Sequence, residues 1–388
     1  MTSFIPLSVP TLNGREKTYI DECLETNWVS SGGRFVTRFG ELCAEVAGAR
    51  FGIPVMNGTA ALHLSVILAG VARGEEVVIP ALTFIGTANA GAEPAILDVD
   101  PVTWQLDPGR LESFLRTSCE RRTGGVFNRA TGRRVAAVMP VHLLGHPCDM
   151  DPILQLAREF GLTVIEDAAE AVGASYKGRP VGGIGRLGCF SFNGNKTFTC
   201  GGGGAILTND EALANRASYL STQAKDDPVL FIHKAVGYNY RLTNVAAAMG
   251  VAQLEAREGY LARKKEINRR YRLALEGVPG VTFMGSANWA GNAMWLTTVR
   301  IDKAKARISN LELMRTLEKG VDGGPRIETR LLWQPMHRSE ALATAYRTDA
   351  PNADSIYGEA LSLPSSVSLT EAEQDQVISA VKRVISGP

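Results

Sequence analysis

Two patterns of hydrophobic and polar residues alternate along residues 46–244. Short apolar runs rich in β-branched residues, such as 51–55 and 76–80, have the length of buried strands. Between such runs, segments such as 59–69 and 152–160 place apolar residues at helical spacing. This alternation is typical of an α/β protein with a mostly parallel sheet and helices on both faces. The same criteria predict a helix over 83–91 and strands over 94–99, 135–141, 162–165, 189–192 and 205–208.

The flanking segments follow different patterns. Residues 1–45 contain one helical pattern, near 14–24, followed by a Ser-Ser-Gly-Gly turn. A long charged helix is expected over 244–275, and shorter strands and helices follow it. The sequence therefore predicts an N-terminal arm (1–45), a large α/β domain (46–244) and a smaller α+β C-terminal domain (245–388).

Composition places the chain among ordinary globular proteins. Of its 388 residues, 45% are hydrophobic and 21% are charged, and 41 Lys and Arg balance 40 Asp and Glu. This balance gives no electrostatic reason to bind nucleic acid or a membrane surface. No apolar run approaches the ~18 residues of a membrane span, and the first residues lack a signal-peptide pattern, so we expect a cytoplasmic protein. The six cysteines never form CxxC, and Gly145 and Pro147 disfavour a helical metal site at His142 and His146, so no metal is expected.

Seven arginines lie between Arg110 and Arg134. Such a cluster forms either an anion-binding patch or the solvated face of an insertion. We favour a solvated helix and hairpin.

Three loops at predicted strand ends carry residues suited to chemistry. Gly58 and Thr59 begin a helix directly after a strand, where free backbone N–H groups attract an anion. Asp167 ends a buried strand, where a carboxylate needs a partner. Lys196 lies between two strands, and a desolvated lysine is an amine nucleophile. The ordinary alternatives are two helix caps and a surface lysine.

An anion cradle, a buried carboxylate and an amine are the three groups that pyridoxal 5'-phosphate requires. Its phosphate needs N–H donors, its ring nitrogen needs an acid and its aldehyde needs a lysine. A nicotinamide-binding fold is disfavoured because no GxGxxG motif follows an early strand.

The local sequences around these loops carry a resemblance that spans nearly the whole chain. They include NGTAALHL (57–64), PVHLLGHPCDMD (140–151), EDAAEAVG (166–173), FSFNGNK (190–196) and VGYNYRLTN (236–244). With them the chain resembles the DegT/StrS-type sugar aminotransferase family. The resemblance implies fold type I, like that of aspartate aminotransferase, and pyridoxal 5'-phosphate as the cofactor.

The resemblance also implies residue roles. Lys196 and Asp167 are the expected catalytic residues, because they match the lysine that binds the cofactor and the aspartate that pairs with its ring nitrogen. The other expected cofactor contacts are Gly58, Thr59 and Ser191 at the phosphate, Phe84 on the ring, Glu170 near the ring hydroxyl, and Asn239 from a neighbouring subunit. The expected substrate contacts are Ser30, Ser31, His233 and Arg241. The chain departs from the family pattern at 200–202 and at Leu331.

Within the family, STQAK at 221–225 and the GYNYR loop are most similar to UDP-sugar 4-aminotransferases of the bacillosamine and legionaminic acid pathways. That similarity implies transfer of the amino group of L-glutamate to C4 of UDP-4-keto-6-deoxy-GlcNAc, in a homodimer with shared active sites. A GDP- or dTDP-linked keto sugar is the alternative substrate. A sugar dehydratase and a non-enzymatic member are disfavoured, because the dehydratase branch carries histidine in place of Lys196 and both key residues are present.

Overall fold

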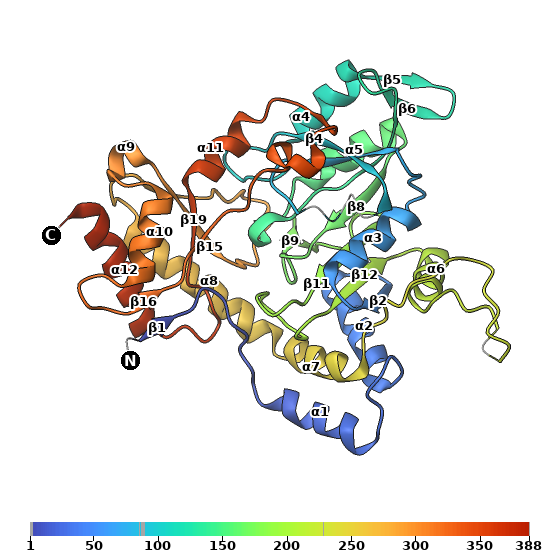
Figure 1. Cartoon of the computed structure of the whole chain (residues 1–388), viewed down its shortest axis with the longest axis horizontal. Helices are drawn as coiled ribbons and strands as arrows, with labels where there is room; N and C mark the ends of the chain where they lie inside the picture. The colour runs from blue at the N-terminus through green and yellow to red at the C-terminus, as the bar shows by residue number, and fades with distance from the viewer. Residues whose placement is uncertain (1–2, 85, 87–89, 228, 388) are drawn as a thin grey trace.

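A ten-stranded sheet forms the centre of the computed structural model, which describes residues 3–84, 86, 90–227 and 229–387 (Figure 1). Eight of its strands run in the order β18-β4-β3-β7-β8-β11-β12-β2, and the β5–β6 hairpin is attached to β7. Neighbouring strands pair in parallel from β18 to β11, and β12 is antiparallel to both of its neighbours, β11 and β2. The strands are β2 (Phe51–Val55), β3 (Glu76–Pro80), β4 (Glu93–Leu97), β7 (Arg134–Val138), β8 (Thr163–Asp167), β11 (Leu187–Ser191), β12 (Gly204–Thr208) and β18 (Tyr346–Arg347).

Successive residues of one strand contact different cores, because side chains alternate across a sheet. In β3, Val77 belongs to a core with helices α3 (Gly58–Leu68) and α6 (Glu211–Ser221). Val78 belongs to a second core with α2 (Arg34–Ala47), α5 (Met150–Phe160) and α7 (Asn244–Glu255). Helices therefore cover both faces of the sheet, as the sequence predicted.

A third core lies in the C-terminal part of the chain. There the antiparallel sheet β13-β15-β19-β17 packs with helices on its apolar side. The strands are β13 (Val281–Phe283), β15 (Thr297–Ile301), β17 (Arg330–Leu331) and β19 (Ala360–Leu363), and the helices are α8 (Arg257–Leu275), α10 (Asn310–Lys319) and α12 (Glu371–Ser386). Ile5 of β1 (Phe4–Ile5) joins this core, because β1 pairs with β16 (Arg326–Ile327). The three-domain division with boundaries at 45 and 244 stays a prediction.

Three predicted elements differ from the structure or fall partly outside it. The single helix expected over 244–275 is wrong: α7 ends and α8 begins around Ala256, whose φ of −94° and ψ of 5° interrupt the helix. The N-terminal segment holds not only α1 (Arg15–Glu25) but also α2, whose buried Phe35 and Phe39 have helical spacing. The helix predicted over 83–91 lies partly outside the described residues.

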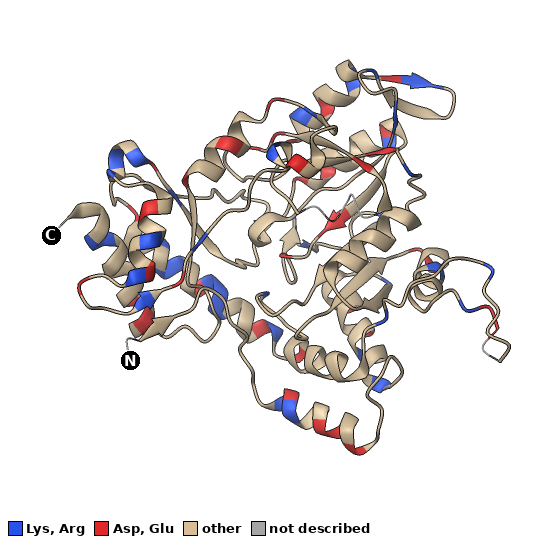
Figure 2. Cartoon of the chain, in the orientation of Figure 1, with Lys and Arg blue, Asp and Glu red and all other residues tan. Residues whose placement is uncertain are grey.

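The arginine-rich segment forms a helix and a hairpin that is attached to β7 of the large sheet, and Figure 2 shows its charges. These elements are α4 (Pro108–Ser113), β5 (Cys119–Arg122) and β6 (Gly125–Asn128). Its arginines pair with glutamates: Arg116 lies 2.7 Å from Glu159, and Arg134 lies 2.9 Å from Glu75. Because these positive charges are matched by carboxylates at or near the surface, the interpretation as a solvated insertion agrees with the structure.

All six cysteines are buried and unpaired. Over the described ranges, no helix combines the length and the apolar character needed to cross a membrane. In the same ranges, no group of three or more His, Cys, Asp or Glu is arranged to hold a metal ion.

Candidate active site

The carboxyl ends of the parallel strands border a cavity of about 560 Å³, the place where α/β sheets bind ligands. Loops that follow β2, β3, β8 and β11 contribute to its wall, and β17 of the small sheet closes one side. Seven residues predicted from the sequence line it: Gly58, Thr59, Phe84, Asp167, Glu170, Ser191 and Lys196. The fold thus brings together side chains from four separate strand ends.

Lys196 lies in a turn after β11, where its N–H donates to the Asn193 carbonyl at 3.0 Å. Its Nζ is 3.3 Å from Oε1 of Glu170 and 3.8 Å from the centre of the Trp295 ring. The indole Nε1–H of Trp295 donates to the Asn195 carbonyl at 2.8 Å. Trp295 therefore holds both the backbone beside the lysine and the amine itself, through a cation–π contact.

Two buried carboxyl groups flank that amine. Asp167 is 6% exposed at the end of β8, and its Oδ1 accepts a hydrogen bond from the Ala169 N–H at 3.1 Å. Burial raises the pKa of Asp167, and the Ala169 N–H and the charge of Lys196 oppose that rise. Burial also raises the pKa of Glu170, against the charge of Lys196 and the N–H of Leu144. Ionised Asp167 needs a cationic partner in the cavity, and a protonated ring nitrogen is such a group.

The start of α3 forms the anion cradle. Oδ1 of Asn57 caps the helix by accepting the Ala60 N–H at 2.7 Å, and no described residue accepts the N–H groups of Gly58 and Thr59. A Cβ on Gly58 would lie 2.7 Å from Cβ of Ser191, so only glycine allows this close approach of α3 and β11. Free N–H groups, a serine hydroxyl and the positive end of a helix suit a phosphate.

These residues fit pyridoxal phosphate. Gly58, Thr59 and Ser191 would hold its phosphate, Asp167 its ring nitrogen and Lys196 its carbonyl carbon. When bound, the cofactor supplies a carbonyl that accepts amines and a ring that accepts electrons.

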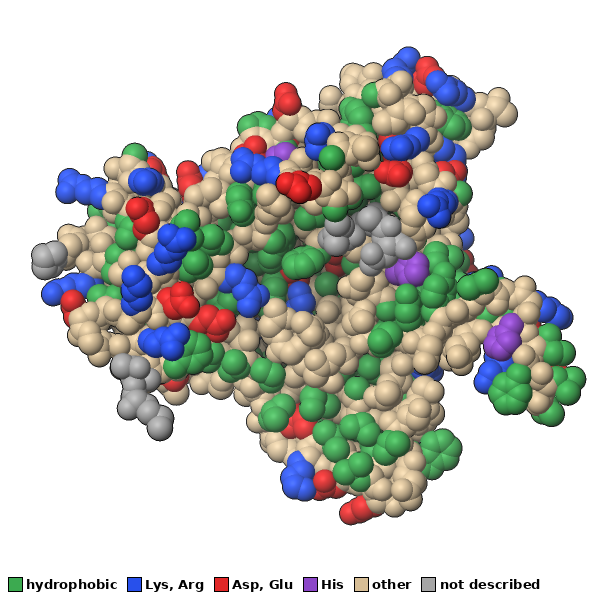
Figure 3. Space-filling view, viewed as in Figure 1, with side chains coloured by type: hydrophobic (Ala, Val, Ile, Leu, Met, Phe, Trp, Pro, Cys, Tyr) green, Lys and Arg blue, Asp and Glu red, His purple; other side chains and the backbone are tan. Residues whose placement is uncertain are grey.

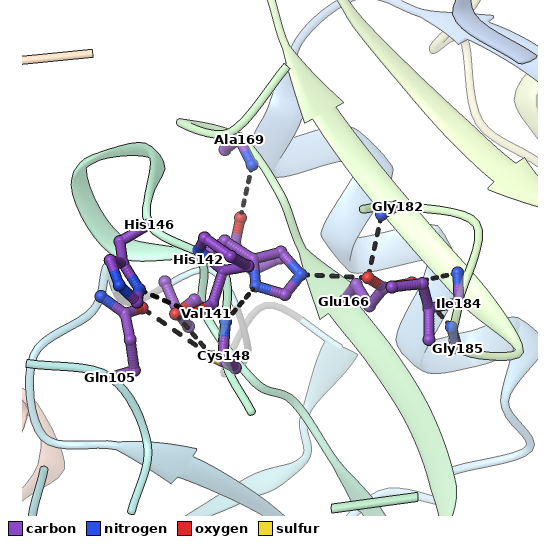
Figure 4. Close-up of polar contacts among 12 residues, drawn as sticks. Gln105, Val141, His142, His146, Cys148, Glu166, Ala169, Gly182, Ile184 and Gly185 are labelled. Atoms are coloured by element: carbon purple, nitrogen blue, oxygen red, sulfur yellow. Dashed lines mark hydrogen bonds and ion pairs between the residues drawn. The ribbon is translucent and has the colours of Figure 1, made fainter. Parts of the chain in front are cut away.

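Behind Asp167, a buried network fixes the end of β8 (Figure 4). Glu166 accepts the backbone N–H groups of Gly182, Ile184 and Gly185 and lies 3.0 Å from Nε2 of His142. Burial alone would raise the pKa of Glu166, but these hydrogen bonds outweigh it and hold the pKa below its ordinary value. Because the Cys148 N–H donates to Nδ1 of His142, the ring proton lies on Nε2 and faces Glu166. His142, one of the two histidines considered for metal binding, is thus part of a hydrogen-bond network.

Five predicted residues do not line the cavity of this single chain: Ser30, Ser31, His233, Asn239 and Arg241. Arg241 pairs with Val55 at the end of β2, and Asn239 lies two residues before it. His233 is exposed, with Nδ1 2.9 Å from the carbonyl oxygen of Gln223. The turn at 30–31 is also exposed. Their roles stay predictions.

Further lining residues were not among the predicted site residues: Trp295, Arg330, Leu331 and Trp333. In the sequence, Leu331 is distinguished only as a departure from the family pattern. The tryptophans gave no sequence signal, because a tryptophan between apolar residues has the pattern of an ordinary core position.

The fold and the site define a class of enzyme, a fold type I aminotransferase. A family model described as the DegT/DnrJ/EryC1/StrS aminotransferase family matches residues 10–382, and the chain belongs to this family. A GDP-perosamine synthase of Caulobacter vibrioides is 38% identical, and the alignment covers 98% of each chain. The Bacillus subtilis protein EpsN, a putative pyridoxal phosphate-dependent aminotransferase, is 36% identical over 96% of this chain and 94% of its own. An Escherichia coli O157:H7 GDP-perosamine synthase is 34% identical over 99% of both chains.

Solved structures of similar proteins have the same fold. DesI, determined in the presence of its TDP-sugar product, has a TM-score of 0.86 and 29% identity and covers 100% of this chain and 94% of its own. Fold type I, the aminotransferase class and pyridoxal phosphate as the family's cofactor are therefore confirmed. The comparisons favour the GDP-linked alternative over the UDP-linked sugar that the sequence placed first.

Proposed function

We propose that this enzyme transfers the amino group of L-glutamate to C4 of a nucleotide-linked 4-keto-6-deoxy sugar, and that the nucleotide is GDP. The observation that carries the reaction is the cavity itself, where Lys196, Asp167 and Glu170 meet beside the start of α3. The GDP assignment is supported by the relatives named GDP-perosamine synthase, which align over almost the whole chain. A product like GDP-perosamine follows from it.

Three side chains of the cavity have a task in this reaction. Asp167 holds a proton on the ring nitrogen, and so keeps the ring able to accept electrons. Lys196, once released from the cofactor, is the base that moves a proton at the carbon bearing the amine. Glu170 lies 3.3 Å from Nζ and orients that amine.

We also propose a homodimer in which the partner supplies Asn239. The segment after α6 projects from the body of the molecule and carries exposed apolar side chains (Figures 1 and 3). Val229 is 79% exposed, Leu230 69% and Phe231 64%. Apolar side chains gathered in this way mark an interaction surface, and a second copy of the chain would cover it.

The test of the substrate uses the purified holoenzyme with L-glutamate and 4-keto-6-deoxy sugars linked to GDP, UDP or dTDP. We expect mass spectrometry to show an amino sugar, with the highest kcat/KM for the GDP substrate. Lys196→Ala is the negative control and should abolish turnover.

A preference for the UDP or dTDP substrate would overturn the GDP assignment and leave the aminotransferase standing. Conversion of glutamate to 2-oxoglutarate without amination of any keto sugar would overturn the sugar class. Deoxygenation in place of amination would overturn the reaction.

A further inference from the structure

The carbonyl of Asn195, the residue before Lys196, is held from two distant parts of the chain. The indole Nε1–H of Trp295 donates to it at 2.8 Å, and the hydroxyl of Ser8 donates to it at the same distance. A carbonyl oxygen has two lone pairs, and these two donors can occupy both. Asn195 and Trp295 line the cavity and Ser8 does not. Ser8 is therefore an anchor that reaches the cavity wall from 187 residues away in the sequence.

Fixing this carbonyl fixes the start of the lysine. The peptide group that joins Asn195 to Lys196 is planar, so its C=O and its N–H turn together. The N–H of the same group donates to the Asn193 carbonyl at 3.0 Å. Both polar ends of the plane are thus bound, and Cα of Lys196 lies at one of its corners. The direction in which the lysine side chain leaves the backbone depends on these hydrogen bonds.

The chain around this serine is itself tied down. Residues 6–9, which we call the N-terminal strap, lie in the segment between β1 and α1 (Figure 1). The Leu7 carbonyl accepts the N–H of Ser365 at 2.7 Å. The Val9 N–H donates to Oγ of Ser366 at 3.0 Å. Hydrogen bonds on both sides of the serine therefore hold the strap against the segment that follows β19.

Packing ties the strap to both parts of the molecule. Ile5, directly before it, is buried in the third core with the small sheet. Leu7 is buried in the core of the large sheet that contains Val77. Ser8 therefore reaches Asn195 from a segment that neither part can move alone.

We propose that Ser8 is a positioning residue for Lys196, which it acts on through the carbonyl of Asn195. This inference rests on the role proposed for Lys196. The amine must reach the reacting carbon from one place in the cavity. If the peptide group before it turns more freely, the amine starts from more conformations and reaches that carbon less often.

The test compares Ser8→Ala, which removes the donor, with Ser8→Thr, which keeps a hydroxyl. Ser355→Ala is the matched control. Ser355 on α11 (Pro351–Glu359) accepts the Arg300 guanidinium at 2.8 Å and does not line the cavity. The first measurement is hydrogen–deuterium exchange of residues 193–199 in the full chain without the cofactor. The second is the glutamate half-reaction of the enzyme loaded with pyridoxal phosphate, over a range of glutamate concentrations.

We expect Ser8→Ala to speed exchange at 193–199 by about threefold to tenfold, the loss of one hydrogen bond, and to leave β8 and β11 unchanged. The maximal rate of the glutamate half-reaction should fall by a similar factor. The half-saturating glutamate concentration should change by less than about twofold, because Ser8 lies outside the cavity. Ser8→Thr should return to within about twofold of wild type, and Ser355→Ala should match wild type.

Wild-type exchange at 193–199 in Ser8→Ala would overturn the inference. Faster exchange throughout the chain would also overturn it, because that pattern is a general loss of stability. Faster exchange at 193–199 with an unchanged maximal rate would show that Ser8 holds the loop without positioning the lysine. If Lys196→Ala keeps full turnover, the proposed role of the lysine falls, while the exchange of 193–199 still decides whether Ser8 holds the loop.

Discussion

The amine of Lys196 is placed by neighbours of opposite character. A carboxylate of Glu170 lies on one side and the face of the Trp295 ring on another. The same indole bonds the carbonyl of Asn195, so one side chain fixes both ends of the lysine. Lysine has a long, flexible side chain, and this bracing reduces the number of rotamers from which it must react.

Replacement of Trp295 separates its two contacts. Trp295→Phe keeps an aromatic face and loses the N–H that binds Asn195, a loss of about 1 kcal/mol, or roughly fivefold in the rate of the glutamate half-reaction. Trp295→Leu loses the ring face as well and should be slower by a further several-fold. Stopped-flow absorbance of the cofactor measures both rates, and thermal unfolding checks the fold. Equal rates in the two variants would show that the ring face contributes nothing.

Lys264 is a second lysine whose position matters, because it holds the backbone of Trp295. This side chain on α8 is 2% exposed and donates to the carbonyls of Trp295, at 2.8 Å, and Ser365. Burial lowers the pKa of Lys264 to about 7. No carboxylate among the described residues pairs with it, so the neutral form is favoured as pH rises.

The pH dependence of unfolding tests that position. From about pH 7 to the ordinary lysine pKa of ~10.4, the unfolded chain binds a proton that folded Lys264 does not. The free energy of unfolding should therefore rise with pH across this window, by at most a few kcal/mol, and stay level for this group below it. In Lys264→Met this part of the rise should vanish, although the variant is less stable throughout. Urea unfolding at pH 7 and pH 9 measures the difference, and parallel profiles would contradict it.

At the scale of elements, the site depends on the close packing of α3 against β11. Gly58 begins α3 and faces Ser191 at the end of β11, and Asn57 caps the helix. This contact sets how the free N–H groups and the serine hydroxyl converge on one anion. Helix and strand are far apart in sequence, so their register is a tertiary feature.

Gly58→Ala should weaken the site without unfolding the protein. Its Cβ would meet Cβ of Ser191 at 2.7 Å and push α3 away from β11. We expect a loss of about 1–3 kcal/mol in stability and about tenfold or more in affinity for pyridoxal phosphate. Gly259→Ala is the matched control, because a Cβ on this glycine of α8 meets nothing within 4 Å. The control should be neutral or more stable, and cofactor titration with thermal unfolding compares the two. Unchanged affinity in Gly58→Ala would contradict the cradle.

The parts of the fold and of the candidate site that could be predicted from the sequence are those that depend on local residue patterns. β3 and β8 were predictable because apolar runs of strand length have few alternatives, and Asp167 because it ends such a run. Lys196 was predictable because it lies in a polar loop between two apolar runs and in the FSFNGNK motif. The break at Ala256 was not, since alanine favours helix. There α7 packs on α1 and α2 while α8 joins the third core, so tertiary contacts set the break. Trp295 and Arg330 were not predicted as site residues, because only the fold brings them into the cavity that Lys196 lines.

At the scale of the whole molecule, a single chain leaves part of the predicted site unused. Asn239 and His233 do not line the cavity. The apolar segment at 229–232 is exposed on the same projecting loop, and Trp28 is 59% exposed near the turn at 30–31. These predicted contacts and exposed surfaces have a common explanation if a second chain covers them, as symmetric dimers do with a self-complementary surface.

Mixing two inactive variants tests the dimer and the origin of Asn239 together. Lys196→Ala and Asn239→Ala should each be impaired alone, the first completely. If Asn239 acts across the interface, a mixed dimer pairs Lys196 of one chain with Asn239 of the other in one of its two sites. Random reassortment makes half of the dimers mixed, so activity should recover to about a quarter of wild type. Native mass spectrometry confirms the mixed dimers, and their presence without recovery would show that Asn239 does not act in trans.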